Sequence, residues 1–488
     1  MLEQLNIFEF SDNQYRIRKP IRLIELFAGI GAQSKALEIL GVNFESYKIC
    51  EWSKESIKAY TYIHHYNEIK NCTDKKIINL KGISRDYNAP MSDEQLGKLK
   101  DDEKILLSNS IKISYNLVDV SSVKGKDLNI VETDKYEYIL TYSFPCQDLS
   151  LAGKLKGMEE NSGTRSSLLW QVCRILKECN EKPQILLMEN VSEVVGTKNR
   201  NDFFKWCNEL ENMGYANFWQ ILNAKDYGIP QNRRRCFMVS ILGKQNTFAF
   251  PKKLKLKHKL LDFLDKNVDE KYFLSDDKLK QVQSWKGYES PLKDIDSNRV
   301  CSTLTTHCGK DSNGMQLVLV PENTKKGYAK AEVGDGIYIN RPEQKRGVVQ
   351  KRIIQTLKTS CNDIGVVVKD EPSPIDFRYD EGIRNRVDKN LCPTITTKNL
   401  GISGCPLIKY NNLRIRKLTP CECYKLMGFT PIDYERCDEI QSNASIYHQA
   451  GDSIVVTVLI AIFGKLLNID YATVIKNYVD NNILLKNF

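Results

Sequence analysis

The chain has 488 residues, with 71 Lys and Arg against 61 Asp and Glu, which gives a formal net charge of +10. Hydrophobic residues make up 41% and charged residues 27%, which excludes a collagen-like, mucin-like or wholly disordered chain. At roughly 100–200 residues per domain, this length predicts two to four domains. The longest apolar run, residues 454–463, is too short to span a bilayer, and no secretory signal is visible at the first residues.

The fifteen cysteines are interpreted as reduced thiols of a cytoplasmic protein, because no export signal accompanies them. Their spacings lack the CxxC and HxxxH patterns of zinc sites, so no metal is expected. The excess of positive charge is mild for this length and permits a nucleic-acid partner without requiring one.

The first half of the chain alternates strand-like and helix-like segments. After an N-terminal arm (residues 1–19), strands are predicted at residues 21–27, 46–50, 116–120, 138–143, 185–189 and 236–242. Helices are predicted between them, for example at 34–40, 166–179 and 201–213. This alternation is typical of an α/β fold, a doubly wound and mostly parallel sheet with helices on both faces. We assign it to a domain of residues 20–250, interrupted by a Lys-, Asp- and Asn-rich insertion at 66–116.

Strand and turn signals replace the helical pattern over residues 251–410, which predicts a smaller, β-rich domain. A pattern of Thr, an apolar residue and Thr before an apolar strand occurs at 301–320, 355–368 and 392–408. Two explanations are open: the pattern reflects a repeat of related hairpins, or it arises by chance in a Thr- and Val-rich region. Helical signals resume over residues 411–488, which we expect to return to the first domain.

Three strand ends carry residues that suit an adenosine-containing ligand. Gly29 and Gly31 follow the first strand, where glycine allows close approach of a ligand to a helix N-terminus. Glu51, at the end of the second strand, can accept both ribose hydroxyls, and Trp52 can stack on adenine. Asp119 ends the third predicted strand. A tight strand–helix turn explains the glycines equally well, and these positions alone do not distinguish a nicotinamide from a sulfonium cofactor.

A cysteine, a glutamate and an arginine cluster follow in order on later strands. Cys146 stands in a Phe-Pro-Cys-Gln loop after a buried strand, where a thiolate could act as a nucleophile. Glu189 ends the next apolar strand, and Arg233 and Arg235 follow Gln231. Each has an ordinary structural interpretation, a buried thiol or a surface charge, but their order together is unusual.

That order resembles the cytosine-C5 DNA methyltransferases, outside residues 66–116 and 255–405. The family's motifs are resembled, in order, by the segments 25–31, 51–52, 144–147, 163–168, 189–191, 231–235, 416–420 with 426–429, and 449–454. The resemblance implies a Rossmann-like, S-adenosylmethionine-dependent methyltransferase domain, S-adenosylhomocysteine as product, and a target recognition domain at 251–410. Glu25, Ala32 and Asp452 depart from residues that the family often has. An Asp at 452 would repel a carboxylate but could attract an ammonium group.

The resemblance assigns the site residues. It implies catalytic roles for Cys146, Glu189, Arg233 and Arg235. It implies cofactor contacts for Phe27, Ala28, Gly29, Ile30, Gly31, Glu51, Trp52, Asp119, Val120, Pro145, Leu168, Asp452 and Ser453. It implies support of the target base by Phe144, Gln147, Asn190, Val191, Arg165 and Gln231.

The expected function is transfer of a methyl group to C5 of cytosine in double-stranded DNA, by base flipping and covalent addition of Cys146 to C6. The lysines at 252–259 are either phosphate contacts or a solvated linker. The chain would belong to a restriction–modification system or a phage, act as a cytoplasmic monomer, and need no stable complex with an endonuclease. One alternative is a tRNA cytosine methyltransferase, which is disfavoured because such enzymes usually have a much smaller variable region than the roughly 150 residues of this chain. The other alternative is a non-catalytic DNA-binding protein of the same fold.

Overall fold

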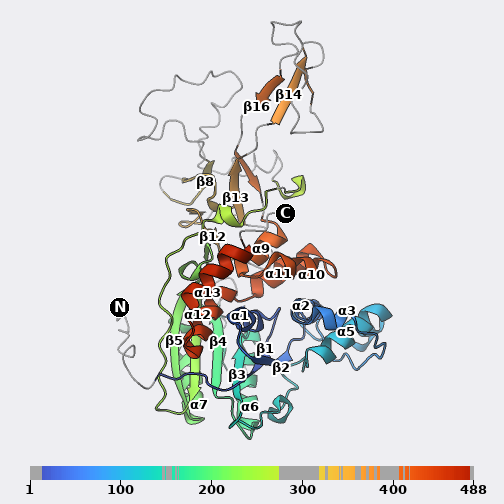
Figure 1. Ribbon diagram of the computed structural model, residues 1–488, viewed down its shortest axis with the longest axis vertical. Helices are drawn as coiled ribbons and strands as arrows, with labels where there is room; N and C mark the ends of the chain where they lie inside the picture. The colour runs from blue at the N-terminus through green and yellow to red at the C-terminus, as the bar shows by residue number, and fades with distance from the viewer. Residues whose placement is uncertain are drawn as a thin grey trace. The chain divides into compact units, whose positions relative to one another are not determined.

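The chain folds into two compact units, drawn in Figure 1. Unit 1 comprises Met1–Lys266, Thr356–Cys361 and Thr419–Phe488, and unit 2 comprises Asn267–Gln355 and Asn362–Leu418. This computed structural model describes residues 14–145, 149, 157–159, 162, 164–266, 268–273, 318–324, 328–339, 341, 344–357, 364–369, 373–378, 382–384, 406–409, 413–416 and 418–483.

Unit 1 is built on a six-stranded sheet with the order β2-β1-β3-β4-β7-β5. Its strands are β1 (Ile21–Leu26), β2 (Phe44–Cys50), β3 (Glu137–Tyr142), β4 (Ile185–Val191), β5 (Tyr215–Asn223) and β7 (Arg234–Leu242). The pairs β1–β2, β1–β3 and β3–β4 are parallel, whereas β7 runs antiparallel to both β4 and β5. The expected α/β fold with a mostly parallel sheet is therefore confirmed.

Helices lie on both faces of this sheet. The helices in the described part of unit 1 are α1 (Ala32–Leu40), α2 (Lys54–His64), α3 (Tyr66–Lys70), α4 (Asp93–Gly97), α5 (Asp101–Ile113), α6 (Leu169–Glu178), α7 (Arg200–Asn212), α9 (Pro420–Met427), α10 (Pro431–Asp438), α11 (Asn443–Asp452), α12 (Val456–Leu467) and α13 (Tyr471–Tyr478). On one face, Ile24 and Leu26 of β1 share a core with α6 and α7. On the other, the neighbouring Glu25 accepts a hydrogen bond from Ser34 of α1. This alternation places successive β1 side chains on opposite faces.

The prediction of a strand at residues 116–120 is wrong. Within this segment only Asn116 forms a β-bridge, which is parallel and pairs it with Ile49. Hydrogen bonds of the Asn116 side chain replace the backbone hydrogen bonds that a strand would form there. Its Oδ1 accepts from the Glu51 N–H at 3.0 Å and from the Val118 N–H at 2.9 Å, while its Nδ2 donates to the Glu51 carbonyl at 2.9 Å. Val118 has a φ of 65°, which no β-strand accommodates.

A strand that the sequence analysis did not predict, β5, forms the edge of the sheet beside β7. Its residues pair with β7 over its whole length, from Tyr215 opposite Leu242 to Asn223 opposite Arg234. The aromatic residues Tyr215, Phe218 and Trp219 were the available signal, since aromatic side chains favour strands.

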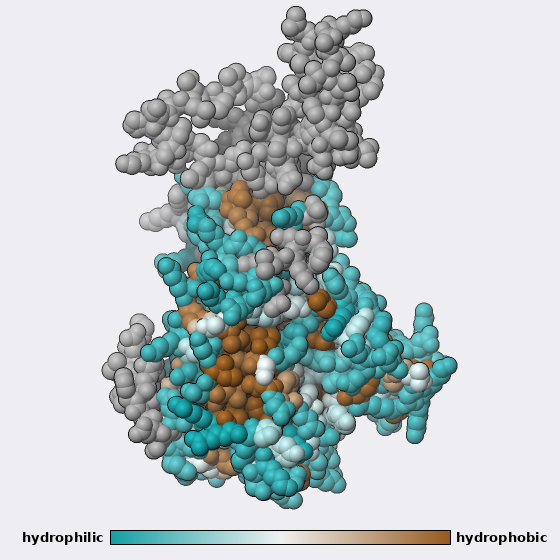
Figure 2. Space-filling model, viewed as in Figure 1, coloured by the Kyte–Doolittle hydropathy of each residue, from teal (hydrophilic) through white to brown (hydrophobic). Residues whose placement is uncertain are grey.

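The segment 66–116 carries α3, α4 and α5 and has a small core of its own. Leu80, Ile83, Met91, Leu107 and Ile111 pack there against Ile57 of α2. Outside this core the segment is hydrophilic, and Figure 2 shows the region of α3–α5 as mostly teal. A capping box of Ser92 and Gln95 begins α4.

Unit 2 is β-rich over its described residues. A four-stranded sheet has the order β11-β10-β13-β17, a three-stranded sheet the order β15-β14-β16, and β8 pairs with β9. The strands are β8 (Val318–Pro321), β9 (Tyr328–Ala331), β10 (Gly336–Tyr338), β11 (Val349–Gln350), β12 (Ile354–Gln355), β13 (Ile364–Lys369), β14 (Ser373–Arg378), β15 (Gly382–Arg384), β16 (Pro406–Lys409) and β17 (Leu413–Arg416). The apolar parts of the three Thr-containing patterns are the strands β8, β13 and β16. The Thr segments at 301–306 and 392–397 lie outside the described residues.

The C-terminal segment supplies the central helix of unit 1. Helix α12 packs against α1 and α13, and nearly all its side chains are buried. The stretch Asn443–Leu467 is long and apolar enough to cross a membrane, yet 83% of its apolar window is buried inside the protein, as in a core helix.

Candidate active site

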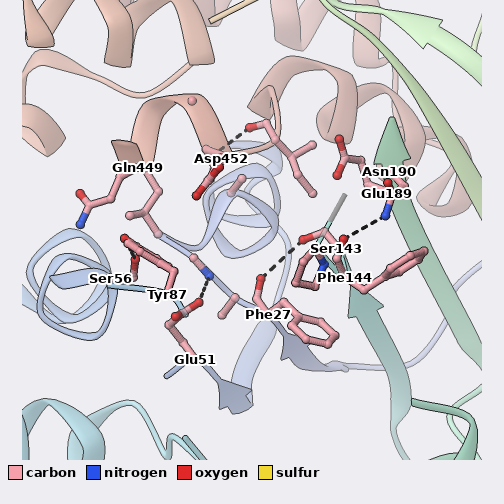
Figure 3. A pocket seen from close by; sticks show the side chains of 18 of the residues that line it. Phe27, Glu51, Ser56, Tyr87, Ser143, Phe144, Glu189, Asn190, Gln449 and Asp452 are labelled. Carbon is pink, nitrogen blue, oxygen red and sulfur yellow. Dashed lines mark hydrogen bonds between the residues drawn. The ribbon is translucent and has the colours of Figure 1, made fainter. Parts of the chain in front are cut away.

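One pocket of unit 1 gathers residues from the carboxyl ends of β1, β2, β3 and β4, from β7, and from α11 (Figure 3). Ligands of doubly wound proteins bind at this edge of the sheet. The sequence-predicted residues that line the pocket are Phe27, Ala28, Gly29, Ile30, Glu51, Trp52, Phe144, Pro145, Arg165, Leu168, Glu189, Asn190, Val191, Arg233, Arg235, Asp452 and Ser453.

The other six predicted residues fall into two groups. Cys146 and Gln147 lie outside the described residues. Gly31, Asp119, Val120 and Gln231 are described but do not line this pocket. The Asp119 carboxylate accepts from the Ser121 N–H at 2.9 Å, and Val120 is part of the core beneath the sheet.

Glu51 is tied to the glycine loop between β1 and α1. One carboxylate oxygen accepts from the Gly29 N–H at 2.9 Å, and the other accepts from the Ser53 N–H at 2.7 Å. Burial raises the pKa of Glu51 to about 7, against the lowering effect of these hydrogen bonds. Gly29 has a φ of 57°, and an added Cβ there would meet no atom within 4 Å, so the loop leaves open space beside Glu51.

A buried polar group supports the same loop from behind. The Glu25 carboxyl lies 2.6 Å from the Tyr60 hydroxyl and 2.7 Å from the Ser34 hydroxyl, both of which donate to it. Burial raises the pKa of Glu25 to about 7. The His64 Nε2 lies 3.0 Å from the Ile30 carbonyl. Burial and the nearby Lys35 charge lower the pKa of His64 to about 3, so a neutral imidazole donates to that carbonyl.

The chain that leads into Cys146 is held by two side chains. Asn190, at the end of β4, donates from Nδ2 to the Phe144 carbonyl at 2.9 Å. The Ser166 hydroxyl donates to the Pro145 carbonyl at 2.7 Å. These two bonds fix the backbone immediately before the cysteine, and Phe144 itself is buried.

Glu189 and two arginines form the opposite end of the pocket from Glu51, as Figure 3 shows for the two glutamates. The Arg235 Nε lies 3.2 Å from the Glu189 carboxylate. Burial raises the pKa of Glu189, although the positive charges of Arg235 and Arg233 act in the opposite direction. The carboxyl group can therefore hold a proton more readily than an exposed glutamate.

Arg233 has a different environment from Arg235. Its guanidinium donates to the carbonyls of Leu357 at 3.1 Å, Gly451 at 3.0 Å and Ser453 at 2.7 Å. Gln231 similarly donates to the Leu426 carbonyl at 2.8 Å and accepts from the Leu357 N–H at 3.2 Å. Both residues thus connect distant segments of unit 1, a role that the sequence analysis did not assign to them.

The sequence analysis missed several residues of the pocket wall. Tyr87 and Asn88 come from the segment 66–116, and His448 comes from α11. No sequence signal pointed to Tyr87, because its polar surroundings are typical of a solvated insertion. His448 could have been found from its place four residues before Asp452, which puts both side chains on one helix face; its Nδ1 lies 3.1 Å from Asp452 Oδ2.

The pocket has an acidic and a basic end. Glu51 and Asp452 lie near enough for the Asp452 charge to contribute to the raised pKa of Glu51, while Arg233 and Arg235 lie near Glu189. Among the described residues, no group of three His, Cys, Asp or Glu side chains could hold a metal ion. The acidic end suits a positively charged ligand.

Comparison with known proteins identifies the family. Residues 104–468 match the model of the C-5 cytosine-specific DNA methylases. The chain is 30% identical over 462 residues to the type II methyltransferase M2.ScrFI of Lactococcus lactis subsp. cremoris, covering 91% of this chain and 99% of the relative. It is 39% identical over 271 residues to the orphan methyltransferase M.SssI of Spiroplasma monobiae, covering 53% of this chain and 68% of the relative.

Among solved structures, the Dnmt2 methyltransferase of S. pombe aligns with 16% identity and a TM-score of 0.48, over 92% of this chain and 99% of that one. The family match extends from helix α5 to the end of α12 and includes the end of β4, β7 and α11, which form much of the pocket. The chain therefore belongs to the C-5 cytosine-specific DNA methylases and is a DNA cytosine methyltransferase.

Proposed function

We propose that this enzyme transfers a methyl group from S-adenosylmethionine to C5 of a cytosine flipped out of double-stranded DNA. The observation that carries the proposal is the convergence, in one pocket, of the glycine loop and Glu51 with Pro145, Glu189 and Arg235. A cofactor end and a base end thus share one cavity, as direct transfer between two bound molecules requires.

The cofactor end fits S-adenosylmethionine by its chemistry. Glu51 offers carboxylate oxygens for ribose hydroxyls, and the open space at Gly29 admits a ligand close to the backbone. Asp452 and Glu51 supply negative charge for a ligand that carries a sulfonium and an ammonium group. When bound, this cofactor supplies an electrophilic methyl group.

At the base end, Cys146 is the proposed nucleophile and Glu189 the proposed acid. The Cys146 thiolate forms a bond to C6 of cytosine while Glu189 donates a hydrogen bond or proton to N3, which makes C5 electron-rich. C5 then takes the methyl group. Loss of the C5 proton to water re-forms the C5–C6 double bond and expels the Cys146 thiolate. Arg235 orients Glu189 and can donate to the O2 of the base.

Unit 2, which comprises Asn267–Gln355 and Asn362–Leu418, overlaps the range 251–410 expected from the sequence and is the proposed target recognition domain. Base flipping costs a few kcal/mol of stacking, which contacts between protein and DNA must offset. We further propose that the enzyme acts in the cytoplasm as a monomer, with a restriction–modification system or a phage as its source and without a stable endonuclease complex.

The proposal is tested with purified protein, methyl-labelled cofactor and duplex DNA that contains 5-fluorocytosine. The wild type is expected to form a covalent complex that survives denaturation, because fluorine at C5 blocks the final elimination. Cys146→Ala is expected to form none, although it should still bind cofactor. Labelled tRNA in place of DNA tests the rival RNA activity. Tight DNA binding without methylation of any sequence would contradict the proposal.

A further inference from the structure

A loop of the segment 66–116 is attached directly to the strand end that carries Glu51 and Trp52. The Ser84 N–H donates to the Trp52 carbonyl at 2.7 Å, and the Lys54 N–H donates to the Ser84 carbonyl at 2.9 Å. The loop closes through a bridge between Ser84 and Pro90. Residues 84–90, here called the 84–90 loop, therefore begin and end beside the cofactor end of the pocket.

The base of the 84–90 loop is also supported by apolar packing. Ile83 and Met91 flank the loop in sequence, and the Met91 N–H donates to the Ile83 carbonyl at 2.8 Å. Both side chains are buried in the small core that includes Ile57 of α2. A loop fixed at both ends in this way can hold its central residues in a defined place.

Tyr87 is the central residue of the loop, and its backbone is strained. Its φ is 62°, a backbone conformation that bulky residues rarely adopt because it is strained. Its ring lines the pocket and stacks on His448 of α11, with centroids 4.2 Å apart and planes 10° from parallel. Its hydroxyl lies 3.2 Å from the Ser56 hydroxyl. The surrounding contacts thus hold an unfavourable backbone so that the ring reaches the pocket.

The stacked pair lies near the charged groups of the acidic end. Glu51 and Asp452 both contribute to raising the pKa of Tyr87, after the larger effect of burial, and Figure 3 shows Tyr87 on the Glu51 side of the pocket. His448 contacts Asp452 across one helical turn. The next loop residue, Asn88, accepts a hydrogen bond from Arg165, which lines the pocket.

We propose that Tyr87 and His448 together form a wall of the cofactor site, so that the 84–90 loop controls how tightly and how long S-adenosylmethionine is held. The segment 66–116 is then a functional part of the site and not a neutral insertion. This inference rests on the proposed cofactor site. Flat, stacked rings at the pocket wall offer apolar area to a nucleoside and exclude water from the Glu51 contacts, which strengthens those contacts.

The test measures the Kd and the dissociation rate of S-adenosylmethionine for the full-length protein by calorimetry and stopped-flow fluorescence. Tyr87→Ala is expected to raise Kd about tenfold, mainly through faster dissociation, whereas Tyr87→Phe keeps the ring and is expected to stay within threefold. The matched control is Tyr115→Ala. Tyr115 belongs to the same segment and also has a positive φ, 50°, but it is 59% exposed and does not line the pocket.

A double-mutant cycle separates a shared wall from general loosening of the fold. If the two rings act together, Tyr87→Ala combined with His448→Ala binds no more weakly than the weaker single variant. Fully additive losses would overturn the proposal, as would a Tyr87→Ala protein that binds like wild type. Should Tyr87→Ala melt early, Tyr87→Asn serves instead, because asparagine tolerates a positive φ.

The two proposals fail in distinguishable ways. A wild-type protein that binds no S-adenosylmethionine and methylates no DNA contradicts the proposed function itself. A wild type that binds and methylates, with a Tyr87→Ala variant of equal cofactor affinity, contradicts only the role of the 84–90 loop. In steady-state assays we expect Tyr87→Ala to raise KM for the cofactor more than it lowers kcat. KM for DNA should change little.

Discussion

Arg235 of β7 lies 3.2 Å from the carboxylate of Glu189, which ends β4. The contact depends on the antiparallel direction of β7, because the start of β7 then lies beside the end of β4, with Arg235 opposite Val191. A residue at the beginning of one strand thus lies beside residues at the carboxyl end of its neighbour. The ion pair keeps the glutamate in place while burial makes its proton easier to retain.

The first prediction concerns Glu189→Gln. Glutamine fills the same space but cannot transfer a proton, so we expect kcat/KM for DNA to fall about 10²–10⁴-fold, the usual range for a lost general acid. Cofactor affinity should change less than twofold, because Glu189 lies at the other end of the pocket. Glu193→Gln, just beyond β4 and outside the pocket lining, is the control and should keep wild-type kinetics. Equal activity of Glu189→Gln and wild type would refute the acid role.

The second prediction separates the two arginines. Arg233 donates to three backbone carbonyls, and lysine cannot reproduce that planar arrangement of donors. Arg233→Lys is therefore expected to lower the free energy of unfolding by about 1–3 kcal/mol as well as activity. Arg235→Lys should reduce activity with little change in stability. Urea unfolding and methyl transfer, measured on both variants, check this; a stable but inactive Arg233→Lys protein would show that the carbonyl contacts contribute little.

The third prediction compares two glycines at opposite ends of α1. Gly31 and Gly41 both have left-handed backbones, with φ of 76° and 65°. An added Cβ at Gly31 would lie 2.2 Å from His64 Nε2 and 2.7 Å from the Tyr60 ring, whereas at Gly41 it would meet nothing within 4 Å. Gly41→Ala should lower the free energy of unfolding by about 1 kcal/mol, from backbone strain alone. Gly31→Ala should lower it by clearly more and should also weaken cofactor binding.

Adding His64→Ala to Gly31→Ala tests the cause, because removal of the imidazole relieves the closest contact. We expect the double variant to recover part of the lost stability in thermal melting. If the double variant is less stable than Gly31→Ala by the full cost of His64→Ala, the steric explanation is wrong.

The fourth prediction concerns pH. Burial raises the pKa of Glu25 from 4.5 to about 7, so the folded protein keeps a proton that the unfolded chain loses at about pH 4.5. The stabilising contribution of Glu25 to the free energy of unfolding is therefore complete below about pH 4.5. It is lost as the pH rises through about 7. Glu25→Gln should remove up to about 3 kcal/mol of this pH dependence. Urea unfolding at pH 5, 6, 7 and 8 measures it, and parallel profiles for variant and wild type would contradict it.

The fifth prediction tests the acidic end of the pocket. Asp452→Asn removes one charge near Glu51 and should weaken S-adenosylmethionine, which has a sulfonium charge, relative to S-adenosylhomocysteine, which has none. Because the Asp452 side chain is 55% exposed, the change in the ratio of the two Kd values should be modest, about twofold to fivefold. Calorimetry with both ligands checks this. An unchanged ratio of the two Kd values would mean that Asp452 contacts only groups that S-adenosylmethionine and S-adenosylhomocysteine share.

The local sequence was sufficient where one segment determines its own structure. The run from β1 through the glycine loop into α1 could be predicted because its strand, its left-handed glycines and the terminating Gly41 are adjacent in the chain. The failures involve partners that are distant in the chain. Asn116 replaces a strand ladder only because Glu51 lies beside it, and Tyr87 becomes a pocket residue only because α11 brings His448 against it. Cys146 itself stays a sequence prediction.

The return of the C-terminal segment to unit 1 has a consequence for biosynthesis. Residues 448–454 complete the pocket, and α12 packs against α1, yet both are made after the whole of unit 2. A nascent chain therefore cannot complete this pocket until unit 2 has been synthesised. The order of synthesis ensures that methyl transfer begins only in molecules that already carry unit 2.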